Sequence, residues 1–506
     1  MTYPHFGHAP HPDGPLPQQQ PGCPVHNQRP LALSNEYMRE GPDKLYQWIR
    51  QEYGPVVPIL LEHEGGNGIP AWLVIGYEEL KQVCSHEELF TRDSRHWREL
   101  AEGRVPATWR LLPQVAYRDN TRFTDTPYHQ PRRDALISAL KRIDQTQTRR
   151  LIEAYADQLI DSFCALGSAE LVAEYARPLP LLVLARLFGL RGNDVGQLLN
   201  AVHRMLQGGQ QAQRADYEIT AILDRLVADR RELPEDDLVS WLIAAVPGLS
   251  DEAVRQDIWL MFTSGAGAAT GWIANCLAQL ATDKELAAGL RSHRLSLEAV
   301  LRATLWNAPP AENVMGSFAR VDVVLGGRTI RAGDMLIHGL GAANRDPALG
   351  EGSARDAHTV SNRAHAAFGA GQHRCPKPAV ILGELITTVA VERLRQRCPH
   401  MALAHPERPL SWGPSFVVRA LTALHVVFTT TPRGARRAPV PSAFGGPSWH
   451  SQNPSSPTAS PPPSAWSSQT PSTSSGAVTP PGTHGHCRRS GPSSRWHSLV
   501  AWLLGR

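Results

Sequence analysis

Residues 368–376 read Phe-Gly-Ala-Gly-Gln-His-Arg-Cys-Pro, and a helical repeat of apolar residues over 379–395 follows them. The spaced glycines let the backbone of this loop approach a flat or bulky group closely. Cys375 stands just before the predicted helix, where free N–H groups and the helix dipole lower the pKa of a thiol and favour the thiolate. Pro376 suits the first position of that helix. The loop therefore presents one sulfur at a helix start.

A thiolate held in this way is the electron-rich axial ligand that haem iron requires for O–O bond cleavage. The alternative is a structural cysteine buried in a glycine-rich loop. The seven cysteines of the chain lie far apart, with no CxxC pair and no zinc-like cluster, which favours reduced thiols. We therefore expect Cys375 to be an iron ligand.

Two cationic side chains stand four residues apart upstream, in residues 123–133, which read Phe-Thr-Asp-Thr-Pro-Tyr-His-Gln-Pro-Arg-Arg. On a helix this spacing places His129 and Arg133 on one face, as the binding of two carboxylates requires. Taken alone, the pair is equally typical of a solvated helix surface. Only its combination with His373 and Cys375 favours a binding role.

The longest apolar helical repeat covers residues 251–281 and contains Phe-Thr-Ser-Gly-Ala-Gly-Ala-Ala-Thr at 262–270. Ala266 and Gly267 are small residues that leave room beside the helix. The Thr270 hydroxyl can bond back to the carbonyl of Ala266 or pass a proton to a bound ligand. The alternative is a helix whose small residues only allow close packing.

These segments together resemble the cytochrome P450 superfamily, and in particular the actinobacterial members that lack its usual Glu-x-x-Arg motif. The haem loop of that family reads FGxGxHxCxG, which is matched by Phe368, Gly369, Gly371, His373 and Cys375, with Lys377 in place of the last glycine. Residues 123–133 are similar to the family's FTDPPEHTRLR segment, and residues 341–347 to its AANRDP turn. The resemblance runs from about residue 31 to 430.

The resemblance implies a mainly α fold with small β sheets, the cytochrome P450 fold, and haem b as cofactor. It gives Cys375 as the iron ligand and Thr270, with Ala266 and Gly267, as the distal oxygen-binding group. The implied cofactor-binding residues are His129, Arg133, His373, Phe368, Gly369 and Arg320. The helical and strand patterns of the sequence agree with this class. Helices are predicted over 35–52, 134–140, 147–166, 180–188, 216–231, 251–281, 297–306 and 379–395. Strands are predicted over 71–75, 321–325, 328–330, 335–338 and 424–428.

Three departures from the family pattern stand out. Trp306 and Ala303 occupy the positions of the family's Arg and Glu, so the usual ion pair behind the haem loop is absent. Burial of the Trp306 ring can replace it, because burying an aromatic side chain stabilises by roughly 2 to 3 kcal/mol while buried ion pairs often break even. Ala269 replaces the acid before the distal threonine. Ser317 replaces an arginine that helps to hold a propionate in related chains, and Arg320 is the nearby substitute.

Composition fits a large globular domain between two unstructured ends. The chain has 506 residues, 42% of them hydrophobic, and a net charge of only +4, which argues against a nucleic-acid partner. We expect a flexible segment over 1–30, a P450 haem domain over 31–431 and a disordered Pro/Ser-rich tail over 432–506. The start lacks a signal-peptide layout and no run approaches the roughly 20 apolar residues of a membrane span, so we expect a cytoplasmic protein with no membrane anchor.

The leading hypothesis is a haem-thiolate monooxygenase that inserts one oxygen atom from O2 into a small, apolar molecule of secondary metabolism. No flavin- or NAD-binding glycine motif is present, so electrons are expected from a separate ferredoxin and its reductase, which can dock beside Arg374 and Lys377. Two alternatives remain open. One is a catalytically impaired, P450-like haem-binding sensor, scaffold or recruitment protein, and the other is a peroxide-driven enzyme that needs no electron partner.

Overall fold

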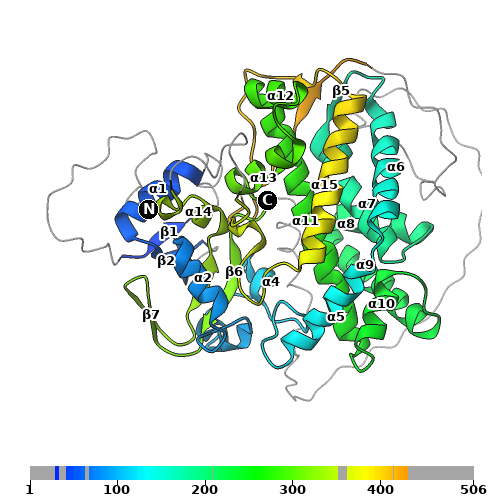
Figure 1. The fold of residues 1–506 in the computed structure, drawn as a ribbon. Helices are drawn as coiled ribbons and strands as arrows, with labels where there is room; N and C mark the ends of the chain where they lie inside the picture. Colours follow the sequence, from blue (N-terminus) through cyan, green and yellow to red (C-terminus); the bar gives the residue numbers. More distant parts are fainter. Residues whose placement is uncertain are drawn as a thin grey trace, which may run out of the picture.

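The computed structural model describes residues 29–33, 42–62, 66, 68–207, 209–350, 362–413 and 415–430. Figure 1 shows two sides, one with the strands β1, β2, β6 and β7 and the helices α1, α2 and α14, and the other with the long helices and β5. The fold is mainly α with small β sheets, as the sequence predicted. The predicted terminal segments lie almost wholly outside the described residues.

The larger sheet has six strands in the order β1-β2-β3-β9-β6-β4. Its strands are β1 (Leu31–Leu33), β2 (Val56–Leu61), β3 (Ile69–Val74), β9 (Met335–His338), β6 (Val314–Ala319) and β4 (Phe90–Thr91). β4 pairs with β6 in antiparallel register, with Phe90 opposite Ala319 and Thr91 opposite Phe318. This pairing brings the chain near residue 92 beside the middle of β6. Smaller sheets join β10 (Ala402–Leu403), β11 (His425–Val427) and β5 (Ser168–Glu170), and β7 (Val323–Leu325) with β8 (Arg328–Ile330).

The helical side is built around α11 (Asp251–Thr282), whose N-terminus is capped by Ser250. It contacts α7 (Pro178–Leu187), α9 (Gly209–Glu232), α13 (Leu297–Asn307) and α15 (Lys377–Arg397). α11 has no single apolar face because it is surrounded by other elements, and its buried residues occupy most of its circumference. α15 in turn packs against α6 (Gln145–Phe163), so α11 and α15 run next to each other through the centre (Figure 1).

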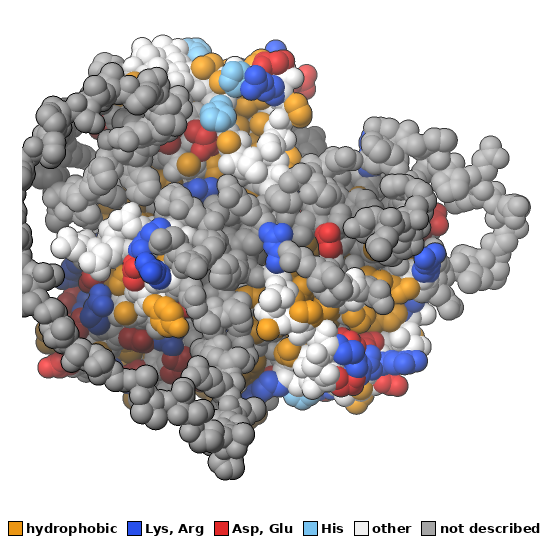
Figure 2. Space-filling model, turned by 180° about the vertical axis from the view of Figure 1, so that it is seen from behind, with side chains coloured by type: hydrophobic (Ala, Val, Ile, Leu, Met, Phe, Trp, Pro, Cys, Tyr) orange, Lys and Arg blue, Asp and Glu red, His pale blue; other side chains and the backbone are white. Residues whose placement is uncertain are grey.

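The remaining helices complete the outer layers. They are α1 (Pro42–Tyr53), α2 (Tyr77–Ser85), α3 (Arg98–Ala101), α4 (Leu112–Val115), α5 (His129–Lys141), α8 (Asn193–Gln207), α10 (Leu238–Ala245), α12 (Lys284–Arg291) and α14 (Leu340–Asn344). No helix among the described residues is long and apolar enough to cross a membrane. On the face shown in Figure 2 the visible Lys and Arg side chains lie among Asp and Glu side chains, so that face carries no field of a single sign.

Candidate active site

The haem-type loop lies between a short 3-10 turn, Ala366–Phe368, and the start of α15 at Lys377. Gly369 and Gly371 both have a positive φ, +72° and +64°, which a side chain would strain. A Cβ on Gly371 would lie 1.7 Å from the carbonyl oxygen of Cys84 at the end of α2, so only glycine allows the two segments to touch. The N–H of Cys375 donates to the carbonyl of Phe368 at 2.9 Å, which closes the loop directly before the helix.

The Cys375 thiol does not have the lowered pKa that we expected from its place at a helix start. Burial raises the pKa of this thiol to about 11, and Arg133 and Arg374 oppose that rise only in part. The expectation was wrong because removing a thiolate from water costs more free energy than its attraction to the helix terminus and to two guanidinium groups provides. The sulfur becomes a thiolate when a cation binds it directly, which is the usual behaviour of a coordinating cysteine.

His129 and His373 face each other across the site. Their rings are stacked, with 4.0 Å between centroids, although one comes from α5 and the other from the haem-type loop. Within the described residues, Nδ1 of His129 and Nε2 of His373 are buried and have no hydrogen-bond partner. Burial, followed by the neighbouring His373 and Arg133, lowers the pKa of His129 to about 4, so its ring is neutral at pH 7. The buried Nδ1 of His129 therefore has no partner among the described residues, and the buried Nε2 of His373 has only carboxylates at ion-pair distance.

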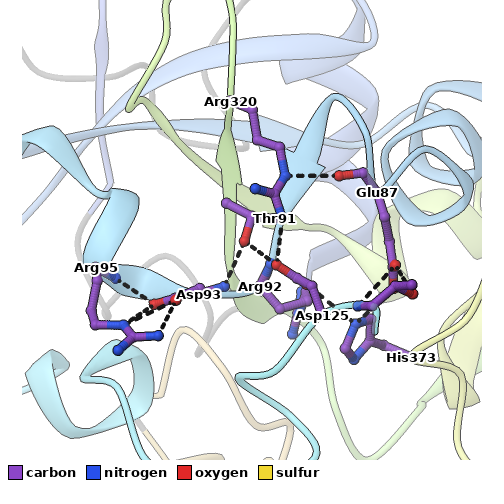
Figure 3. A network of polar contacts seen from close by, with 9 residues as sticks. Glu87, Thr91, Arg92, Asp93, Arg95, Asp125, Arg320 and His373 are labelled. Carbon is purple, nitrogen blue, oxygen red and sulfur yellow. Dashed lines mark hydrogen bonds and ion pairs between the residues drawn. The ribbon is translucent and has the colours of Figure 1, made fainter. Parts of the chain in front are cut away.

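Carboxylates border this pair on one side, a feature the sequence reasoning missed. Glu87 Oε1 lies 3.4 Å and Asp125 Oδ1 3.8 Å from His373 Nε2, and Figure 3 shows both acids between His373 and Arg320. Arg320 donates to the Glu87 carbonyl at 2.9 Å and to Asp125 Oδ2 at 2.8 Å. Arg320 is thus already paired with an acid, which weakens our suggestion that it substitutes for the arginine replaced by Ser317.

Arg133 reaches the haem-type loop from α5. Its Nη2 donates to the carbonyl of Arg374 at 2.5 Å, next to the expected iron ligand. The preceding residue, Arg132, points the other way and forms a buried ion pair with Asp257 of α11 at 2.7 Å. Thr121 also donates its N–H to Asp257, at 2.8 Å. This pair was not predicted, and it fixes α5, which carries His129, against the helix that carries Thr270.

The distal segment is a continuous part of α11. Ala266 is buried, and Gly267 and Thr270 are half-buried. Within the described residues the Thr270 hydroxyl has no hydrogen-bond partner, whereas Thr263 bonds back to the carbonyl of Trp259 at 2.8 Å. The alternative in which Thr270 bonds to the Ala266 carbonyl is therefore not the one seen. Its hydroxyl is available to a ligand.

Trp306 takes the place of the missing arginine of α13. Its side chain is fully buried, and its indole N–H donates to the carbonyl of Asn362 at 3.1 Å. The ring also meets His365 edge-on at 5.8 Å between centroids. The tryptophan thus joins α13 to the segment that leads into the haem-type loop, by one hydrogen bond and by ring packing, as an ion pair does in the family pattern.

A buried ion pair also lies close to this region, and the sequence reasoning did not find it. Glu312 follows α13, Arg345 follows α14, and their side chains meet at 3.2 Å with both residues buried. Arg345 further donates to the carbonyls of Gly341 and Asn307, each at 2.6 Å. A Cβ on Gly341 would lie 1.9 Å from the Glu312 carboxylate, so glycine is needed there. The only sequence signal was a lone acid after a double proline.

Comparison with known proteins gives the family. A cytochrome P450 of Streptomyces sp., 105C1, is 30% identical over 384 residues, covering 73% of this chain and 94% of that protein. The mycinamicin IV hydroxylase/epoxidase of Micromonospora griseorubida is 30% identical over 380 residues, covering 71% and 90%. The solved structure of CYP154A1 from Streptomyces coelicolor A3(2) superposes with a TM-score of 0.67 at 28% identity, over 79% of this chain and all of that one. No family model matches.

The chain therefore belongs to the cytochrome P450 superfamily. Its fold is the P450 fold and its class is that of oxygen-incorporating oxidoreductases, as the resemblance implied. Membership of this family implies a haem cofactor and a reaction between a small molecule and O2.

The residues of the site fit a haem group. Cys375 is a free thiol in the loop, and the buried Nδ1 of His129, which has no hydrogen-bond partner among the described residues, is suited to one of the carboxylates that haem carries.

Proposed function

We propose that the protein is a haem b monooxygenase of secondary metabolism that uses Cys375 as the axial iron ligand. The observation that carries this proposal is the constrained loop around Cys375, closed by its N–H bond to Phe368 and followed at once by α15. Bound haem supplies the oxygen activation and insertion chemistry. The protein supplies the ligand, the shape of the site and the charges around it.

The propionate side is assigned to His129 and His373. Their buried nitrogens lack partners among the described residues, and a carboxylate is the group that satisfies two such nitrogens together. Arg133 is proposed to bind the cofactor as the resemblance implies, and its guanidinium also holds the Arg374 carbonyl beside the ligand. Phe368 shapes that loop, and its ring lies 5.9 Å from Trp272 of α11.

The distal side is assigned to Thr270, with Ala266 and Gly267 giving the space beside it. A hydroxyl without a partner can donate to a bound ligand and receive its next proton from water. Because Ala269 provides no acid at the neighbouring position, we propose that water or a substrate hydroxyl completes the proton path. Proton delivery then depends on the single threonine.

Electrons are proposed to come from a separate ferredoxin and its reductase. Arg374 and Lys377 are exposed on either side of the loop that carries Cys375, where an acidic protein can bind close to the iron ligand. The substrate class follows from relatives only. These include the hydroxylase/epoxidase named above and the polyketide biosynthesis P450 PksS of Bacillus subtilis, 26% identical over 368 residues. A small organic molecule of secondary metabolism is the proposed substrate, as the sequence led us to expect.

The test is oxygen incorporation from 18O2 with a ferredoxin, its reductase and NADPH, using testosterone and macrolactones as apolar probes. A product that carries one 18O atom, and that is lost in Cys375→Ser, is expected. A product formed with hydrogen peroxide but not with the ferredoxin system would replace the proposal with the peroxide-driven alternative. Intact haem-thiolate spectra without turnover of any probe that binds would instead support the sensor alternative.

A further inference from the structure

The register of β4 and β6 places Arg92 opposite the position of the missing arginine. Phe90 pairs with Ala319 and Thr91 with Phe318, so the next residue of the antiparallel pair, Arg92, faces Ser317. The contact is direct, since Arg92 Nη1 donates to Ser317 Oγ at 3.2 Å. Both residues are buried, at 7% and 1% exposure. A guanidinium therefore stands at this point although position 317 itself holds only a serine.

Arg92 is a buried cation, and among the described residues no carboxylate accepts a hydrogen bond from its guanidinium. Asp125, the nearest acid, accepts the backbone N–H of Arg92 at 3.0 Å, while Arg320 and Thr91 take the other oxygen of that acid. Within the described residues the Nε of Arg92 is buried and has no hydrogen-bond partner. Burial lowers the pKa of Arg92, as expected for a guanidinium removed from water. A buried and incompletely bonded cation is costly unless an anion binds it.

The groups around Arg92 lead to the haem-type loop. Ser317 Oγ lies 2.8 Å from Nε2 of the buried His338, and Nδ1 of His338 lies 3.7 Å from Cys84 Sγ. The carbonyl of Cys84 is the atom against which Gly371 of the loop is packed. Arg92, His373 and Arg122 are all close enough to lower the pKa of His338 by charge repulsion, after burial. Arg92 and His373 therefore border one buried region, in which Asp125 accepts the backbone N–H of Arg92 and lies 3.8 Å from His373 Nε2.

We propose that Arg92 binds one haem propionate and thereby takes over, from the neighbouring strand, the role that an arginine at position 317 has in related chains. The inference rests on the proposed function, since it needs haem in the site. In this proposal Ser317, which is itself held by His338, orients the Arg92 guanidinium. The Nε of Arg92 is then left to donate to the carboxylate of the propionate. Arg320 remains bound to Asp125 and does not bind this propionate.

The test measures how fast the purified holoprotein transfers haem to excess apomyoglobin. Arg92→Met, which keeps an unbranched apolar stem but removes the guanidinium, should lose haem about 10- to 100-fold faster, the range for one buried charge-assisted hydrogen bond. Arg92→Lys should fall between. Adding Ser317→Arg to Arg92→Met should restore the rate to within a few-fold of wild type, because it returns the guanidinium from the opposite strand. The matched control, Arg393→Met, removes a guanidinium that pairs with Asp157 between α15 and α6, and it should stay within about 3-fold.

A second readout separates binding from packing. Loss of a cation beside a propionate disfavours the reduced, more negative haem, so Arg92→Met should lower the reduction potential and the double variant should recover it. A wild-type rate for Arg92→Met, or a faster rate that Ser317→Arg fails to correct, would overturn the role of Arg92. In both cases a wild-type protein with a thiolate-ligated haem spectrum leaves the proposed function standing. A wild type without that spectrum would overturn the proposed function itself.

Discussion

In the proposed function Thr270 has a large share of the proton transfer, because its neighbour is Ala269 and its hydroxyl is unpaired within the described residues. We predict that Thr270→Ala diverts electrons from product to hydrogen peroxide and lowers product per NADPH by roughly 10-fold or more, as loss of a positioned proton donor does. Thr270→Ser, which keeps the hydroxyl, should stay near wild type. Parallel assays of NADPH, product and peroxide check this, and unchanged coupling in Thr270→Ala would contradict the relay.

Trp306 is the residue that replaces the usual ion pair behind the loop. Trp306→Ala should lower the free energy of unfolding by about 3–5 kcal/mol, because it leaves a large cavity and an unpaired carbonyl at Asn362. Trp306→Phe keeps most of the packing and should cost only about 1–2 kcal/mol for the hydrogen bond and the lost area. Chemical denaturation of the two variants measures the difference. Equal losses would mean that the indole N–H, and not the ring, dominates.

At the level of elements, the Glu312–Arg345 pair joins the end of α13 to the end of α14. Removing one partner leaves the other charge buried, so Glu312→Gln and Arg345→Met should each lower the free energy of unfolding by about 3–5 kcal/mol. The double variant should lose less than the sum, since neither charge is then left alone. Denaturation of the four proteins gives the coupling energy. Additive losses would show that the two side chains stabilise the fold independently.

A half-buried carboxyl group on α9, that of Asp216, makes the free energy of unfolding depend on pH. Burial raises the pKa of Asp216 to about 6, and Arg118 and Arg255 counter this only partly. Between about pH 4 and pH 6 the folded chain keeps a proton that the unfolded chain has released, so this residue lowers stability as pH rises through that window. Asp216→Asn should therefore melt close to wild type near pH 4 and be more stable by about 1–3 kcal/mol at pH 7. A difference that does not change with pH would contradict the shift.

Long helices were predictable because their apolar period extends over many turns. The repeat at 251–281 became α11, Asp251–Thr282, and the repeat at 379–395 became α15, Lys377–Arg397. β2 was missed, because Pro58 in the run Val-Val-Pro-Ile-Leu-Leu argues against a paired strand, yet Pro58 pairs with Trp72 in the sheet.

Some residues of the candidate site could be predicted from the sequence, and others could not. Cys375 was a candidate because it stands in a glycine-rich loop before a helix, and His373 because the loop resembles that of the family. Arg92 and Ser317 are 225 positions apart, and no periodic pattern connects residues that only a sheet register brings together. The same holds for Glu312 and Arg345. The raised pKa of the Cys375 thiol was also out of reach, because it depends on burial by the whole fold.

For the whole molecule, the central claim is that a P450 site without its usual ion pair still holds haem through the Cys375 thiolate. The most direct test is the absorbance of the dithionite-reduced protein with carbon monoxide, beside Cys375→Ser. We predict the red-shifted Soret band of thiolate-ligated haem in the wild type and its loss in the variant. A wild-type band at the shorter wavelength of haem without thiolate, or the same red-shifted band in Cys375→Ser, would contradict the claim.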